Sequence, residues 1–179
     1  MNRNTVKFNP AALPQEFLKT MGGSDPSAGS KQFLLPGQLF ASRQPTTVTT
    51  ILGSCVAVCL WSPSTGIGGM NHYLLPEGSS AEANRLRYGN NANPALLNEL
   101  LTLGCDLRDL QGKIFGGAST MAGVDPATSL GKRNLELALE FLRANRVPLV
   151  GKHVSEKRGC KLTFQTNNGV TLLKSFEDE

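Results

Sequence analysis

Hydrophobic and β-branched residues recur in several short stretches of the chain, a pattern typical of strands. The stretches cover residues 46–52, 55–61, 67–76, 113–115, 148–150, 160–166 and 170–173. Turn-forming residues follow two of them, with Pro63 to Gly66 after the second stretch and Asn167 to Gly169 after the sixth. The pattern therefore predicts two β-hairpins and further strands around them.

Two segments carry apolar residues at helical spacing instead. Asn93 and Pro94 are suited to cap and begin the first helix, and Gly104 is suited to end it. The second helix is expected from about Gly131 to Asn145. The apolar faces of the two helices consist of Leu96, Leu97, Leu100, Leu101, Leu135, Ala138, Leu139 and Leu142. These elements predict an α+β (mixed α/β) fold, a single domain in which mixed or antiparallel β-sheets are flanked by helices.

Composition separates a core from the two ends of the chain. Residues 22–30 have the Gly- and Ser-rich composition of a linker, so we expect residues 1–34 to be a flexible N-terminal extension. The domain itself is expected over residues 35–175, followed by an acidic tail at 176–179. A loop at 77–93 is long for a compact domain, and such loops often carry function.

The overall composition is that of a soluble globular protein, with 40% hydrophobic and 18% charged residues. A net charge of +4 favours an acidic partner without specifying one. Aromatic residues make up only 6% and are not interleaved with a basic stripe, so a nucleic-acid partner is not expected. No run of about 18 apolar residues predicts membrane insertion, and the N-terminus lacks the apolar core of a secretion signal, so we expect a cytoplasmic protein.

The candidate chemistry lies in the first predicted hairpin, which carries Cys55 and His72. If the hairpin is centred between Ser64 and Thr65, Ala57 faces His72, and Cys55 becomes its diagonal neighbour on the same face. A register shift of one residue would separate the two side chains. A thiol and an imidazole brought together are the minimal equipment for acyl transfer by a cysteine nucleophile, and an imidazolium is expected to lower the pKa of the thiol.

Glycines next to this pair favour a catalytic role over a purely structural one. Gly53 and Ser54 suggest a tight turn that exposes the thiol and directs backbone N–H groups at an oxyanion. Gly68 and Gly69 leave room on the facing strand for another backbone or for a substrate. The structural alternative is a small buried cysteine and a hydrogen-bonded core histidine. The glycines at 116–117 either line the site or only form a turn.

A zinc site built from Cys55, Cys59 and His72 is the competing interpretation. Four residues along a strand span about 13 Å, whereas two ligands of one zinc each lie about 2–2.3 Å from it. We therefore expect no metal, and nothing in the sequence calls for an organic cofactor. The four cysteines at 55, 59, 105 and 160 match no disulfide framework, which favours a reducing compartment.

Several blocks of the sequence occur together and carry a resemblance to one family. The blocks are Leu52–Leu60, Gly66–His72, Arg87–Gly89, Phe115–Ala118, Gly131–Asn134 and the end of the last hairpin at Leu172–Lys174. Over residues 35–175 the chain resembles the chemoreceptor glutamine deamidase family CheD.

The resemblance implies a protein-glutamine glutaminase, an enzyme that deamidates selected glutamine side chains of methyl-accepting chemotaxis receptors to glutamate, with glutamate methyl ester hydrolysis as a related activity. It implies a catalytic set in which Cys55 is the nucleophile, His72 the base and Thr49 the residue that orients the histidine. It also implies receptors as protein partners and, in some members, binding to the phosphatase CheC. The alternative is a non-catalytic chemotaxis adaptor that binds receptor helices.

The chain departs from the family pattern in its long N-terminal extension, in a basic segment at 151–159 and in Cys160. These departures leave the implied catalytic set intact and affect the surface offered to a partner. Basic residues that could meet an acidic receptor surface, or form an ordinary solvated face, are Arg85, Arg87, Lys152, Lys157 and Arg158.

Overall fold

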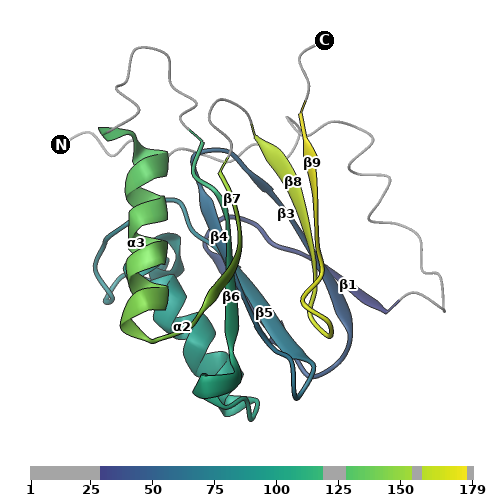
Figure 1. Cartoon of the computed structure of the whole chain (residues 1–179). Helices are drawn as coiled ribbons and strands as arrows, with labels where there is room; N and C mark the ends of the chain where they lie inside the picture. Colours follow the sequence, from purple (N-terminus) through teal and green to yellow (C-terminus); the bar gives the residue numbers. More distant parts are fainter. Residues whose placement is uncertain (1–28, 119–127, 155–158, 177–179) are drawn as a thin grey trace.

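The computed structural model describes residues 29–118, 128–154 and 159–176, whose strands form two sheets (Figure 1). The five-stranded sheet has the order β2 (Gln38–Ser42), β5 (Ile67–His72), β4 (Val56–Ser62), β6 (Gln111–Gly116) and β7 (Leu149–His153). The four-stranded sheet has the order β1 (Ser30–Phe33), β3 (Thr46–Leu52), β8 (Cys160–Gln165) and β9 (Thr171–Ser175). The β1–β3 and β6–β7 pairs are parallel and the others antiparallel, so both sheets are mixed.

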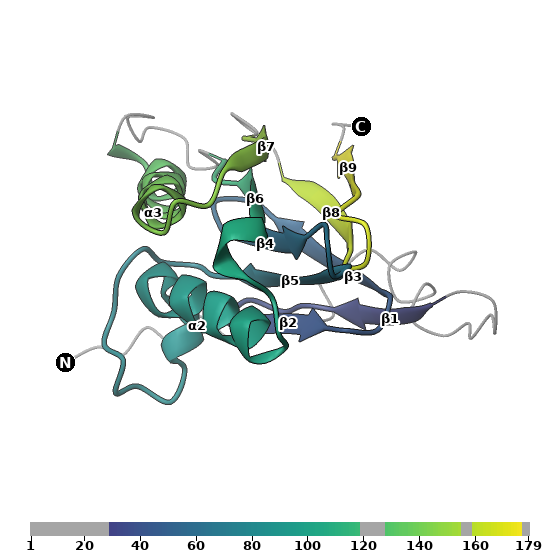
Figure 2. The ribbon, with the colours of Figure 1, turned by 60° about the horizontal axis from the view of Figure 1, so that its bottom comes forward.

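The two sheets and a pair of helices stack as three layers (Figures 1 and 2). Helices α2 (Gly89–Thr102) and α3 (Leu130–Ala144) cover one face of the five-stranded sheet, and the four-stranded sheet covers the other. Short 3-10 turns η2 (Arg85–Arg87) and η3 (Leu107–Asp109) flank α2. This arrangement confirms the predicted α+β domain. Within the described ranges, no helix is both long enough and apolar enough to cross a membrane.

Strand β4 lies at the centre of this stack and contributes to two hydrophobic clusters. Val56, Val58 and Leu60 pack with the helices, whereas Ala57 and Cys59 pack with the four-stranded sheet. A strand covered on both faces has an unbroken apolar sequence, because every side chain meets a core. The residue before β4, Cys55, therefore lies where the buried strand meets the surface.

Several predicted elements are confirmed, but α2 begins earlier than expected. Strand β3 has the predicted bounds, and α3 differs from its prediction by one residue at each end. Helix α2 begins at Gly89, so Pro94 lies inside it. The backbone carbonyls of Leu75 and Pro76 accept hydrogen bonds from the first N–H groups of α2, so a tertiary contact replaces the side-chain cap expected at Asn93.

The predicted start of the domain at residue 35 is also wrong. Ser30–Phe33 pairs in parallel with Thr46–Thr49, and Leu34 is buried in the core. Strand β1 lies at the edge of its sheet and is mostly exposed, so its sequence lacks the alternation that marks a half-buried strand. Strand β2 was missed as well. The rest of the predicted extension, residues 1–28, and the tail at 177–179 lie outside the described residues.

Gly68 and Gly69 on β5 allow close packing of neighbouring backbone. A Cβ atom at Gly68 would lie 2.5 Å from the carbonyl oxygen of Thr166, and one at Gly69 would lie 2.8 Å from that of Phe40. The room predicted on this strand is therefore filled by protein: the glycine at 68 lets the other sheet approach, and the one at 69 lets β2 and Leu96 of α2 pack closely.

Candidate active site

The β4–β5 hairpin has the predicted register. Its ladder pairs Cys59 with Met70, and an isolated bridge pairs Val56 with Tyr73 in the same alignment. His72 consequently faces the four-stranded sheet, on the side of β5 that also carries Met70. Because side chains alternate along a strand, Cys55 shares this side. The structure thus confirms the hairpin register that the predicted pairing of Cys55 with His72 requires.

Cys55 is the most accessible of the four cysteines. Its side chain is half-buried, whereas Cys59, Cys105 and Cys160 are buried, and all four are free thiols. Cys59 packs in the apolar cluster between the sheets. A reagent or a substrate can therefore reach Cys55 more readily than any other thiol of the chain.

The three carbonyl groups around Cys55 are all held by hydrogen bonds. Gly117 N–H donates to the carbonyl oxygen of Cys55 at 2.8 Å, and Ala118 N–H donates to that of Gly53 at 2.9 Å. The Nδ2 group of Asn134 donates to the carbonyl of Ser54 at 3.1 Å. Among the residues that the structure describes, no oxygen accepts a hydrogen bond from the N–H groups of Ser54 and Cys55. These two donors are available to an oxyanion.

Gly116 and Gly117 make this close approach possible. Both have positive φ angles, +98° and +74°, which favour glycine. A Cβ atom at Gly116 would lie 2.2 Å from the carbonyl oxygen of Cys55. The end of β6 therefore packs directly against the backbone of the Cys55 segment.

His72 is buried and held through one ring nitrogen. Its Nδ1 lies 2.8 Å from Oγ1 of Thr50, and that hydroxyl donates its single proton to the carbonyl oxygen of Leu34, also at 2.8 Å. The Thr50 oxygen must therefore accept from His72, so Nδ1 carries the ring proton. Nε2 then holds a lone pair, and among the described residues it has no hydrogen-bond partner. This tautomer leaves Nε2 ready to accept a proton.

The predicted contact between Thr49 and His72 is absent, because the neighbouring Thr50 makes it instead. Thr49 Oγ1 lies 3.4 Å from Oγ1 of Thr163 on β8. Successive residues of β3 point to opposite faces, so only one of the two threonines can face the five-stranded sheet. Thr50 is fully buried on that inner face, whereas Thr49 is half-buried on the outer one.

Burial keeps both reactive groups uncharged. Desolvation lowers the pKa of His72 to about 4, and the backbone carbonyl of Leu34 only partly opposes it. Desolvation raises the pKa of the Cys55 thiol to about 11, against the stabilising effect of its own backbone N–H group. Burial therefore favours a neutral thiol and a neutral imidazole, in contrast to the expected thiolate stabilised by an imidazolium.

Two buried asparagines near the site had no role predicted for them. Asn71 precedes His72, accepts from Val58 N–H through Oδ1 and donates through Nδ2 to Oδ1 of Asn93 on α2. Asn134 on α3 reaches the Cys55 segment, as described above. Asn71 stands out in the sequence as a polar amide within an apolar run, which indicates a buried partner but does not identify it. Asn134 has charged neighbours in the sequence and carries no such signal; both asparagines lie in blocks that carry the family resemblance.

The other predicted residues lie around the site or outside the described structure. The second of the two histidines, His153, was not predicted to belong to the site, and it is exposed on β7, which β6 separates from β4. The carbonyl of Arg87 in η2 accepts from the N–H groups of Leu74 and Leu75, which places η2 beside the chain that follows His72. Lys157 and Arg158 lie outside the described residues.

Comparison with known proteins finds one family over most of the chain. A family model described as CheD chemotactic sensory transduction matches residues 74–175, a range that begins just after His72. Proteins named probable chemoreceptor glutamine deamidase CheD are similar over a longer range. The one from Rhodospirillum rubrum is 36% identical over 82% of this chain and 83% of its own length. Those from Anaeromyxobacter dehalogenans and Trichlorobacter lovleyi are each 38% identical over 86% of this chain, and over 91% and 95% of their own lengths.

Proposed function

The chain belongs to the CheD family, and we propose that it is a cysteine-dependent amidohydrolase that converts glutamine side chains of chemotaxis receptors to glutamate. The names of its relatives support the substrate. The observation that carries the chemistry is the half-buried Cys55, next to two unpaired N–H groups and on the same side of the hairpin as a base-ready His72. A protein-glutamine glutaminase needs these three parts and no cofactor.

In the first half of the proposed reaction, Cys55 Sγ attacks the carboxamide carbon while His72 Nε2 accepts the thiol proton. The substrate oxygen becomes an oxyanion and takes hydrogen bonds from the N–H groups of Ser54 and Cys55. The C–N bond then breaks, and the proton on Nε2 passes to the leaving nitrogen, which departs as ammonia. A thioester remains on Cys55.

In the second half, water replaces ammonia. His72 Nε2 takes a proton from water as the water oxygen bonds to the thioester carbon. The C–S bond breaks, the proton returns to the sulfur of Cys55, and glutamate is released. The same two steps would hydrolyse a glutamate methyl ester with methanol as the leaving group, so we expect weak esterase activity.

The contacts at Nδ1 define how the histidine is kept in place during both steps. Each proton transfer makes His72 briefly cationic, and its Nδ1–H then faces the oxygen of Thr50 and, behind it, the carbonyl of Leu34. These acceptors stabilise the cation and prevent rotation of the ring. We therefore assign the orienting role to Thr50, in place of Thr49.

The setting of this activity follows from the same family membership. We propose receptors as the protein partners, the cytoplasm as the location and a CheC-like phosphatase as a further partner. The rival function is an adaptor that binds receptor helices without changing them. It needs neither an accessible thiol nor a free base, so the geometry of Cys55 and His72 favours the enzyme.

Mass spectrometry of receptor peptides tests the proposal. A purified receptor fragment is incubated with the wild-type protein, with Cys55→Ala, or with Cys59→Ala as a control four residues further along the chain, on β4. We expect glutamine-to-glutamate mass changes and ammonia release with the wild type and Cys59→Ala, and neither with Cys55→Ala. Binding of the receptor by the wild type without any mass change would instead support the adaptor, and fragmentation of the receptor would indicate a protease.

A further inference from the structure

Asn134 on α3 connects the two chain segments that carry the nucleophile and the base. It is fully buried, and its Nδ2 donates to the carbonyl oxygens of Ser54 at 3.1 Å and Leu74 at 2.8 Å. Ser54 immediately precedes Cys55, and Leu74 follows His72 by two residues. One helical side chain thus links segments that otherwise meet only across the hairpin.

The orientation of the Asn134 amide is set by its partners. Only the NH₂ end can donate to two carbonyl groups, and a flipped amide would turn its own oxygen towards them. Oδ1 is left buried without a partner among the described residues, which is a cost that the fold tolerates. The side chain is therefore placed for donation to these two carbonyls.

Two further contacts hold helix α3 against the site, one at the Asn134 carbonyl and one at the start of the helix. The hydroxyl of Tyr73, the residue after His72, donates to the carbonyl oxygen of Asn134 at 2.6 Å. At the first turn of α3, a Cβ atom on Gly131 would lie 2.3 Å from the carbonyl oxygen of Gly117. Because Gly117 N–H also binds the carbonyl of Cys55, the start of α3 and the Cys55 segment are packed through a single residue.

Holding the Ser54 carbonyl also sets the direction of the Cys55 N–H group. The peptide unit is planar and trans, so the C=O of Ser54 and the N–H of Cys55 point in opposite directions. While Asn134 holds the carbonyl towards α3, the N–H group is directed away from the helix. Without that hydrogen bond, the peptide could rotate and remove the N–H donor from the oxyanion position.

We propose that Asn134 is a positioning residue that fixes the Ser54–Cys55 peptide relative to His72, so that the Cys55 N–H group stays directed at the substrate carbonyl. This inference rests on the proposed function, because it names the residue that holds the oxyanion donor of that reaction in place. Asn134 touches no reacting atom and acts through the backbone of the nucleophile.

The test compares Asn134→Leu with Ser129→Ala, a control on the same helix. Leucine has a similar size and removes both donors. Ser129 caps α3 by accepting from Lys132 N–H, so its loss weakens the same helix without touching either carbonyl. We expect Asn134→Leu to lower kcat about tenfold or more with KM within about threefold, as for a weakened oxyanion donor. Ser129→Ala should keep kcat within about twofold.

Alkylation of Cys55 by iodoacetamide gives a second readout that needs no receptor. The Cys55 N–H group also stabilises the thiolate, so misplacing it should raise the pKa of the thiol. At a fixed alkaline pH, Asn134→Leu should then react at least about threefold more slowly than Ser129→Ala, which corresponds to half a pKa unit. If the wild type fails to deamidate receptors, the proposed function falls, and this comparison still decides the role of Asn134.

Equal kcat and equal alkylation in Asn134→Leu and Ser129→Ala would overturn the proposal. If Asn134→Leu does not fold, Asn134→Ser is judged by the same two measurements, because its smaller side chain avoids steric conflict. Failure of both variants to fold would make Asn134 a purely structural residue and would also overturn the proposal.

Discussion

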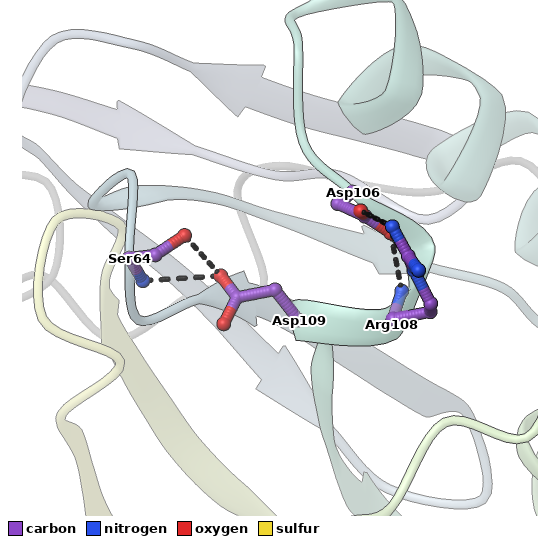
Figure 3. Close-up of polar contacts among 4 residues, drawn as sticks. All are labelled: Ser64, Asp106, Arg108 and Asp109. Carbon is purple, nitrogen blue, oxygen red and sulfur yellow. Dashed lines mark hydrogen bonds and ion pairs between the residues drawn. The ribbon is translucent and has the colours of Figure 1, made fainter.

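The two ends of strand β4 differ in whether the polar groups beside them have hydrogen-bond partners. At the far end, the carboxylate of Asp109 accepts hydrogen bonds from the hydroxyl of Ser62 at 2.5 Å and from the hydroxyl and N–H of Ser64 at 2.6 and 3.0 Å. Figure 3 shows Asp109 reaching the turn at Ser64, beside the separate pair of Asp106 and Arg108. Hydrogen bonds, first of all from Ser62, hold the pKa of Asp109 below its usual value.

At the near end, the same strand begins beside donors and a base without partners. The N–H groups of Ser54 and Cys55 have no oxygen acceptor among the described residues, and Nε2 of His72 is buried without a hydrogen-bond partner there. An unpaired buried polar group costs free energy, so a hydrogen bond from a bound molecule to Nε2 of His72 would be stabilising. The comparison teaches that one strand can end in a cluster that pairs its carboxylate and begin beside donors and a base that have no such partners.

The largest effect should come from Cys55. Cys55→Ala removes the proposed nucleophile, so we expect deamidation to fall by at least about 10³-fold, as in other enzymes that lose a catalytic nucleophile. The melting temperature should change little, because the side chain is only half-buried. Turnover and thermal unfolding measured on the same preparation check both statements. Substantial remaining turnover would contradict the assignment of the activity to the Cys55 end of β4.

The second largest effect on activity should come from substitution of His72. His72→Gln removes the base, and we expect a loss of about 10²–10⁴-fold in kcat. His153→Gln is the control, because His153 lies exposed on β7 and has no place in the proposed site. Rate measurements on both variants with one receptor substrate check the prediction, and equal losses in the two would contradict the pairing with Cys55.

The buried neutral His72 should also make folding sensitive to acid. The unfolded chain binds a proton at the ordinary pKa of 6.5, whereas the folded protein binds it only near 4. The free energy of unfolding should therefore fall as the pH drops from 6.5 towards 4, by on the order of 3 kcal/mol in total, and this contribution should be constant above 6.5. Denaturant unfolding of wild type and His72→Gln over this range gives the difference. Parallel curves would show that His72 does not titrate as its burial requires.

A matched pair of threonine variants sharpens the assignment at the reactive end. Thr50→Val keeps the shape of the side chain and removes the acceptor for Nδ1, so we expect kcat to fall about tenfold. Thr49→Val removes only the contact with Thr163 and should leave kcat within about twofold. Kinetics of the two proteins at one pH separate the two assignments, and a larger loss in Thr49→Val would restore the family-based expectation.

The smallest effect should come from the satisfied end. Ser62→Ala removes one donor to Asp109 and the acceptor for Thr65, so we expect a loss of about 1 kcal/mol in the free energy of unfolding, or about 2–4 °C in the melting temperature. Activity should stay the same. Thermal unfolding with parallel rate measurements checks this, and a fall in kcat without a fall in stability would link the two ends of β4.

Local patterns predicted the reactive hairpin well, because a strand alternates with a period of two and a Pro–Gly turn limits the register. These two rules were sufficient to place Cys55 and His72 on one side. They failed for α2, whose first N–H groups are capped by carbonyls from residues 75–76. They also failed for β1, which lies exposed at a sheet edge.

Thr49 and Thr50 show a contact that the sequence alone could not assign, namely which threonine binds His72. The two side chains are identical and adjacent, so only the packing of β3 against the other sheet determines which of them meets His72. The proton on Nδ1 follows from a chain of contacts between His72, Thr50 and Leu34, which come from three separate segments. Periodicity and turn chemistry act between neighbours in the chain and can be found in the sequence, whereas burial, tautomer and pKa depend on groups that only folding brings together.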